Sequence, residues 1–168
     1  MAGAVVAAAM TVGSAESVSA QGAPAGGGGA AAQAPAPPPI VAYRKAMMQT
    51  SSQHQAALRA LLSGQVTGTT DEDIEMHVGA LVNQGKMFPR MWPAGSTHEL
   101  SRATEDIWTK PEEFSARLKA FADAGEALKK AADTGDNTVT MTALTAFGQT
   151  CGACHTPFRK PAPPAPPR

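Results

Sequence analysis

Two cysteines and a histidine in this chain have the spacing of a known cofactor attachment site, in the segment Cys151-Gly-Ala-Cys154-His155. C-x-x-C-H is the pattern by which c-type haem is attached. Two thiols one helical turn apart can each add to a vinyl group on one side of a porphyrin, and the next residue projects its imidazole towards the iron. The motif therefore predicts one covalent haem c, with Cys151 and Cys154 as thioether donors and His155 as an axial iron ligand.

Two other interpretations of the cysteine pair are weaker. A zinc site would need a second pair of ligands, and His54, His77 and His98 show no paired ligand spacing in the sequence. A thioredoxin-like redox pair would need a βαβ context, and no strand pattern is visible. Because these are the only two cysteines, a disulfide framework is not expected either.

Four amphipathic segments must position this motif. They run from about Val41 to Leu62, from Asp71 to Gln84, from Pro111 to Gly135 and from Thr138 to Phe158. Apolar residues recur along them in steps of three and four, and in the last segment both cysteines continue the apolar stripe. Residues 87–101, with two prolines and a glycine, are expected to form a loop. The expected fold is all-α, an antiparallel four-helix bundle.

The ends of the chain differ in composition from its middle. Residues 2–12 form a short apolar run, followed by the small-x-small pattern Val18-Ser19-Ala20, which predicts a signal peptide over residues 1–20. No basic residue precedes the run, which indicates an atypical signal or a start site placed too far downstream; a leader without a targeting role is the alternative. Residues 21–39 are predicted to be a Gly/Ala/Pro-rich linker, residues 40–160 the folded domain, and residues 161–168 a Pro-rich tail.

The charge balance excludes some partners. With 14 basic and 14 acidic residues, no net field favours nucleic acid or an acidic membrane surface. The N-terminal apolar run is too short for a transmembrane helix, so no stable membrane insertion is expected after a signal is removed. Covalent haem attachment takes place in exported proteins, and the predicted location is the periplasm.

The haem motif lies near the C-terminus of a helical bundle, and this placement resembles the cytochrome c-prime family. Mitochondrial-type cytochromes c carry the motif near the N-terminus instead. The resemblance covers about Ile40 to Lys160, essentially the whole predicted domain. Further segments that share the family's signatures are Tyr43-Arg44 with Met48, the loop Phe88 to Ser96, Ile107-Trp108, and Cys151 to Lys160.

The resemblance implies roles for further residues. Arg44 is expected near a haem propionate, since a guanidinium suits a carboxylate, and Arg159 is expected beside His155 on the proximal side. Met48 and Trp92 are expected to line the distal face. In this family that face is packed with apolar side chains, which leaves the iron five-coordinate and open to small gases such as nitric oxide (NO) and carbon monoxide (CO).

The sequence departs from the family pattern at three positions. Lys45 stands where the family often has Gln, and Trp92 replaces a usual Phe, which predicts a tighter distal pocket. Pro157 falls in the last turn of the last helix, where it should kink or end the helix and so affect the position of Arg159.

Met48 separates two functional hypotheses. As a core methionine it leaves the iron open, and the protein then binds NO or CO and passes single electrons. As a sixth iron ligand it makes a low-spin electron carrier. The Tyr-Arg signature and the 88–96 loop resemble the five-coordinate branch and favour the first hypothesis. A haem peroxidase would need a polar distal base, which Met48 and Trp92 do not offer, so the chain is not expected to be an enzyme.

The expected partners follow from the same resemblance. Small redox proteins would exchange electrons with the haem, and the gases would be its ligands. Members of the family often pair through their first two helices, so a homodimer is expected here.

Overall fold

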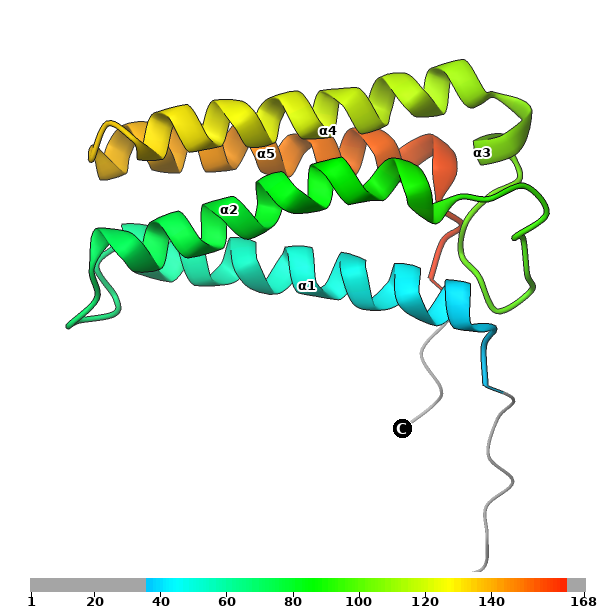
Figure 1. Cartoon of the computed structure of the whole chain (residues 1–168), viewed down its shortest axis with the longest axis horizontal. Coiled ribbons are helices and arrows are strands. Elements are labelled where there is room, and N and C mark those ends of the chain that lie inside the picture. The colour runs from blue at the N-terminus through cyan, green and yellow to red at the C-terminus, as the bar shows by residue number, and fades with distance from the viewer. Residues whose placement is uncertain (1–35, 163–168) are drawn as a thin grey trace, which may run out of the picture. The chain divides into compact units, whose positions relative to one another are not determined.

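The computed structural model describes residues 36–162, so the predicted signal peptide and most of the predicted linker and tail lie outside the described residues. Four long helices run antiparallel to their neighbours in sequence (Figure 1). Helix α1 packs on α2 and α5, and α4 packs on the same two helices, which closes a ring of four. The predicted four-helix bundle is confirmed. The long helices are α1 (Pro39–Leu62), α2 (Asp71–Met87), α4 (Pro111–Ala132) and α5 (Asn137–Phe158).

The helices begin where the sequence supplies suitable first residues. Pro39 and Pro111 occupy the first turns of α1 and α4, where a missing N–H leaves no broken hydrogen bond. Asp136 caps α5, because its carboxylate accepts hydrogen bonds from the backbone N–H groups of Thr138 (2.8 Å) and Val139 (3.1 Å). Asp73 accepts from the backbone N–H of Thr70 at 2.8 Å and completes the start of α2.

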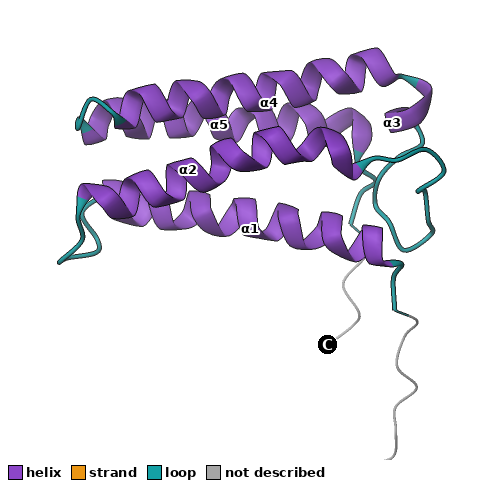
Figure 2. Cartoon of the chain, viewed as in Figure 1, coloured by secondary structure: helices purple, strands orange, loops and turns teal. Residues whose placement is uncertain are grey.

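The segment predicted as a loop is partly helical, which corrects the prediction. Helix α2 (Figure 2) continues to Met87, and the 3₁₀ helix η1 (Phe88–Met91) follows directly. Pro89 does not prevent this, because it stands in the first turn of η1, where its nitrogen needs no acceptor. A four-residue helix, α3 (Asp106–Thr109), is too short to show any hydrophobic period and was not predicted.

Large apolar side chains fill most of the bundle. The rings of Phe121 and Phe147 lie 4.7 Å apart, and Phe121 also stacks on Phe88 at 4.9 Å. A smaller cluster closes the end of the bundle where α3 lies, and it contains Ile107 and Phe158. The fully buried side chains of the main cluster include Leu58, Val78, Leu81, Met91, Leu128 and Leu144.

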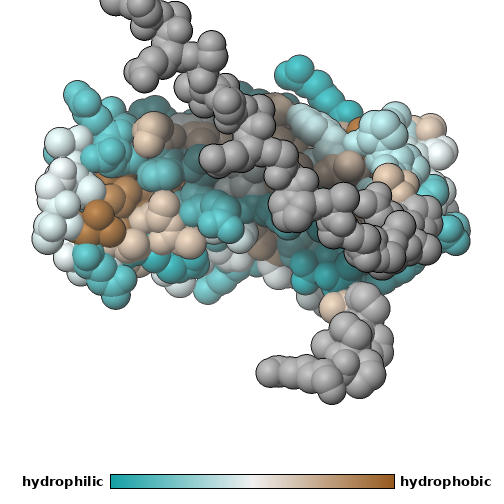
Figure 3. Space-filling model, turned by 90° about the horizontal axis from the view of Figure 1, so that it is seen from below, coloured by the Kyte–Doolittle hydropathy of each residue, from teal (hydrophilic) through white to brown (hydrophobic). Residues whose placement is uncertain are grey.

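The α1 side of the bundle is largely polar where the view in Figure 3 leaves it uncovered. Figure 3 shows the α1 side, where hydrophilic residues dominate and hydrophobic ones gather towards the connection between α1 and α2. Within residues 36–162, none of the helices combines the length and the hydropathy that a membrane span requires.

Helices α2 and α4 approach each other most closely at Gly85. A Cβ atom at this position would lie 3.1 Å from the Cα and 3.3 Å from the Cβ of Ala122. Gly79 lies in the same helix, but a Cβ atom there would meet nothing within 4 Å. The two glycines therefore differ in packing while they share the same helical backbone.

Gly85→Ala is expected to lower the free energy of unfolding by about 1 kcal/mol. Overpacking against the α4 backbone costs about 1–3 kcal/mol, more than the gain of at most about 1 kcal/mol in helix propensity. The matched control Gly79→Ala should raise stability by about 0.5–1 kcal/mol, since only the propensity changes. Urea unfolding followed by circular dichroism measures both. A Gly85→Ala protein as stable as the Gly79→Ala protein would contradict the close approach.

Candidate functional site

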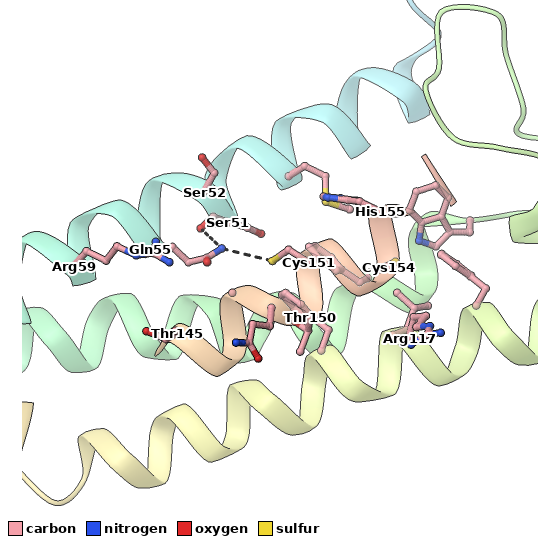
Figure 4. A pocket seen from close by; sticks show the side chains of 18 residues that line it. Ser51, Ser52, Gln55, Arg59, Arg117, Thr145, Thr150, Cys151, Cys154 and His155 are labelled. Carbon is pink, nitrogen blue, oxygen red and sulfur yellow. Dashed lines mark hydrogen bonds between the residues drawn. The ribbon is translucent and has the colours of Figure 1, made fainter. Parts of the chain in front are cut away.

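A cavity of about 370 Å³ lies between α1, α4, α5, η1 and the residue after η1. Its volume is in the range of about 300–1,000 Å³ that cofactor and ligand sites occupy. The three residues of the predicted haem motif, Cys151, Cys154 and His155, all line it (Figure 4). The opposite walls are largely apolar and aromatic, formed by Met48, Phe88, Trp92, Phe114, Leu118 and Phe121.

The cysteines reach the cavity because they continue the buried stripe of α5. Leu144 and Phe147, earlier on this stripe, are fully buried, and Phe158 is buried at its end. Cys151 and Cys154 are half-buried free thiols between them. Burial raises the pKa of the Cys154 thiol, with a further contribution from Cys151 that Arg117 opposes, so this sulfur is protonated at neutral pH.

Gln55 connects α1 to the first cysteine, a contact that the sequence did not predict. Its Nε2 donates to the Sγ atom of Cys151 at 3.8 Å and to the backbone oxygen of Ser51 at 3.4 Å (Figure 4). Gly148 makes room for it, because a Cβ atom there would lie 3.4 Å from Gln55 Oε1 and 3.3 Å from Arg59 Nη2. A buried polar residue on an apolar helix face was the only signal in the sequence.

His155 is half-buried, and its imidazole is mainly neutral at neutral pH, with a free lone pair on one ring nitrogen. Burial lowers the pKa of its imidazole first, and the positive charges of Arg159 and Arg102 lower it further. A neutral imidazole is the form that binds a metal ion. The backbone N–H of Arg159 also donates to the His155 oxygen at 3.1 Å, while the Arg159 side chain is exposed and lies outside the cavity wall.

Pro157 does not stop α5, which continues one residue further to Phe158. The chain then becomes extended at Arg159, with φ −131° and ψ 124°, and pairs with Ala103 in an antiparallel bridge. Arg102 reinforces this pairing, because its guanidinium donates to the backbone oxygen of Lys160 at 3.0 and 2.8 Å. The position of Arg159 is thus set by a loop far away in the sequence, and neither Arg102 nor this pairing was predicted.

Arg44 is almost completely buried, with 4% of its surface exposed, and does not line the cavity. Its guanidinium donates to the backbone oxygens of Met91 (2.7 Å) and Ser96 (2.8 Å) and to the Ser96 hydroxyl. It also stacks on Trp92, with Cζ 4.5 Å from the ring centroid. In this structure Arg44 fixes the loop that carries Trp92, and its contact with a haem propionate stays a prediction.

Met48 and Trp92 both line the cavity, and both are half-buried. That they form the distal face of a haem stays a prediction. Trp92 packs edge-on against Phe114, with ring centroids 5.2 Å apart. Its Nε1 is the one buried side-chain nitrogen or oxygen of the described residues that has no hydrogen-bond partner. A buried polar group left unpaired costs about 1–3 kcal/mol, so this N–H needs an acceptor that the described residues do not supply.

The residues of the cavity therefore fit a haem. They provide two thiols and a neutral imidazole on α5, apolar walls for the porphyrin, and an unpaired indole N–H. The zinc alternative gains no support, because no three His, Cys, Asp or Glu residues among those described are grouped so as to hold a metal ion.

Comparison with known proteins agrees with this site. Residues 39–159 match the family described as Cytochrome C'. Cytochrome c' of Pararhodospirillum photometricum is 34% identical over 121 residues, which cover 71% of this chain and 95% of that protein. Cytochrome c-556 of Agrobacterium tumefaciens is 31% identical over 120 residues, with the same coverage of 71% and 95%.

The fold agrees as well. The solved nitric oxide complex of a mutant of cytochrome c prime from Alcaligenes xylosoxidans superimposes with a TM-score of 0.67 at 25% identity, and the match covers 73% of this chain and 94% of that one. The family match spans the whole bundle and includes the two cysteines and the histidine. The chain belongs to the cytochrome c' family, and its cofactor is a covalently attached haem c.

Proposed function

We propose that this chain is a periplasmic haem protein that binds NO or CO at a five-coordinate iron and passes single electrons. The observation that carries the proposal is the shared cavity, which brings Cys151, Cys154 and His155 together opposite an apolar wall. Solved relatives include a nitric oxide complex and a carbon monoxide-bound variant of the Alcaligenes xylosoxidans protein. Haem iron supplies the one-electron chemistry and the gas site when it is bound.

The proximal side would be built by α5. Cys151 and Cys154 would hold the haem through two thioethers, and His155 would be the axial ligand. Its neutral state, which burial and the two nearby arginines favour, suits this role. Arg159 and Arg102 place positive charge near His155, on the proximal side. This charge would stabilise the reduced, ferrous state of the iron relative to the ferric state.

The distal side would be closed by Met48 and Trp92 without a second protein ligand. Apolar walls at this position exclude charged ligands and leave room for small uncharged gases. Neither Met48 nor Trp92 can act as an acid or base on a bound ligand. We therefore propose gas binding and electron transfer without enzymatic turnover.

Export and pairing complete the proposal. The predicted signal peptide supports the periplasmic location, and small redox proteins would be the electron partners. We also propose a homodimer through α1 and α2. The proposal is supported by two large apolar side chains that these helices expose, since exposed apolar surface marks interaction sites. Tyr43 on α1 is 41% exposed and Met76 on α2 is 61% exposed.

The visible spectrum tests the iron coordination. We expect the dithionite-reduced protein to show a broad band without a sharp α peak, because the iron lacks a sixth protein ligand, and to bind CO. Met48→Ala should leave the resting spin state unchanged. Sharp, split α and β bands that disappear in Met48→Ala would instead establish Met48 as the sixth iron ligand. The protein would then be an electron carrier without an open gas site.

The covalent attachment is tested by mass spectrometry of the denatured protein. The wild type and each single variant, Cys151→Ser or Cys154→Ser, should retain haem mass, because one thioether is enough. The double variant should lose it completely. Gly152→Ala is the matched control between the cysteines, since its Cβ would meet nothing within 4 Å, and it should retain the haem. Haem bound covalently to the double variant would refute the assignment.

A further inference from the structure

Two histidines outside the haem cavity face each other across the first two helices. His54 lies on α1 and His77 on α2, and their Nδ1 atoms are 2.8 Å apart. The ring centroids are separated by 5.1 Å, and the ring planes are inclined at 59°. Both residues are half-buried, and neither lines the cavity.

The separation of the two nitrogens matches one edge of a metal coordination sphere. Two nitrogens bound to one ion by bonds of about 2.0 Å lie about 2.8 Å apart at a right angle and about 3.3 Å apart at the tetrahedral angle. The observed distance is that of the hydrogen bond between the rings, and it is close enough to both values for the two nitrogens to reach one ion after a small turn of the rings. One ring holds its proton on Nδ1 in the hydrogen bond, and to bind the ion it would release this proton to water and take one from water on Nε2, so that it stays neutral. Both Nδ1 lone pairs would then be directed at the ion as the rings turn about their Cβ–Cγ bonds.

The surroundings of the pair suit a cation. The hydrogen bond between the two Nδ1 atoms is the only one that either side chain makes with the described residues. No Lys or Arg stands one turn from either histidine along its own helix, so no cation of α1 or α2 repels an ion there from that distance. Burial, and then the neighbouring His77, lower the pKa of His54, which favours the neutral ring.

The helices that carry the two rings are firmly held together. On the inner side of the same contact, the Ser51 hydroxyl donates to Oε1 of Gln84, and both residues are buried. Leu58 on α1 and Leu81 on α2, each one turn after its histidine, belong to the main core cluster and have no exposed surface. A ligand pair on two fixed helices loses little freedom when it binds an ion, and this raises the affinity that two ligands alone can give.

We propose that His54 and His77 form a two-histidine binding site for a divalent transition-metal ion, with Cu²⁺ bound most tightly. No third His, Cys, Asp or Glu of the described residues completes the set, so water fills the remaining positions. The order of affinity follows the general preference of nitrogen ligands, in which Cu²⁺ exceeds Ni²⁺ and Zn²⁺. This site goes beyond the proposed gas binding and does not depend on the haem iron.

Titration calorimetry of the haem-loaded full chain with CuCl₂ tests the proposal. We expect one Cu²⁺ per chain, and we expect His54→Asn and His77→Asn each to weaken binding at least tenfold. The matched control is His98→Asn, because His98 lies in a loop and its Nδ1 accepts from the backbone N–H of Leu100 at 3.1 Å. This variant should bind Cu²⁺ like the wild type. Wild-type affinity in His54→Asn or His77→Asn, or a loss confined to His98→Asn, overturns the site.

Thermal unfolding of the same samples separates binding from a folding defect. An ion that binds only the folded state raises the Tm, so CuCl₂ should raise the Tm of the wild type and of His98→Asn. It should leave the Tm of the two pair variants unchanged, even if their Tm without metal is lower. The haem absorption spectrum, recorded in parallel, shows whether the haem is loaded. A Tm rise in the pair variants equal to that of the wild type also overturns the proposal.

Discussion

The structure depends on the burial of one apolar stripe along α5. Leu144 and Phe147 are completely buried and hold α5 against α4 and the other helices. Further along the stripe, Cys151 and Cys154 occupy core positions with smaller side chains, and there the packed core gives way to the cavity. Because a large cavity in a bundle weakens it, the haem that fills this space is expected to contribute to stability as well as to function.

The second organising interaction is the burial of Arg44. A charge removed from water is tolerated only when its donors are paired, and the Met91 and Ser96 oxygens of η1 and the loop after it provide that pairing. The same guanidinium stacks on Trp92, so the loop and one wall of the cavity are fixed by a residue that comes from α1. Arg44 thereby shapes the haem site without lining it.

The surroundings of the site set the protonation states of its functional side chains. Burial and two arginines favour a neutral His155, while burial keeps the Cys154 thiol protonated. Across the bundle, an apolar wall that contains Met48 faces the same space. The fold alone would not reveal these properties, because four-helix bundles serve many functions, and only the particular side chains in the cavity point to haem and gas binding.

The sequence by itself determined the four long helices and the haem motif, since both follow from local spacing. The period of apolar residues predicted the helices to within a few residues, and C-x-x-C-H depends on neighbours along one helical turn. The sequence did not predict that α2 continues into η1. A proline such as Pro89 normally ends a helix, and only the structure shows that it stands in the first turn of a new 3₁₀ helix. Only the tertiary structure decided the partners of Arg44, the contact of Gln55 with Cys151, the unpaired Nε1 of Trp92 and the pairing of His54 with His77. These contacts join residues far apart in the chain, and no local pattern encodes which side chains meet when helices pack.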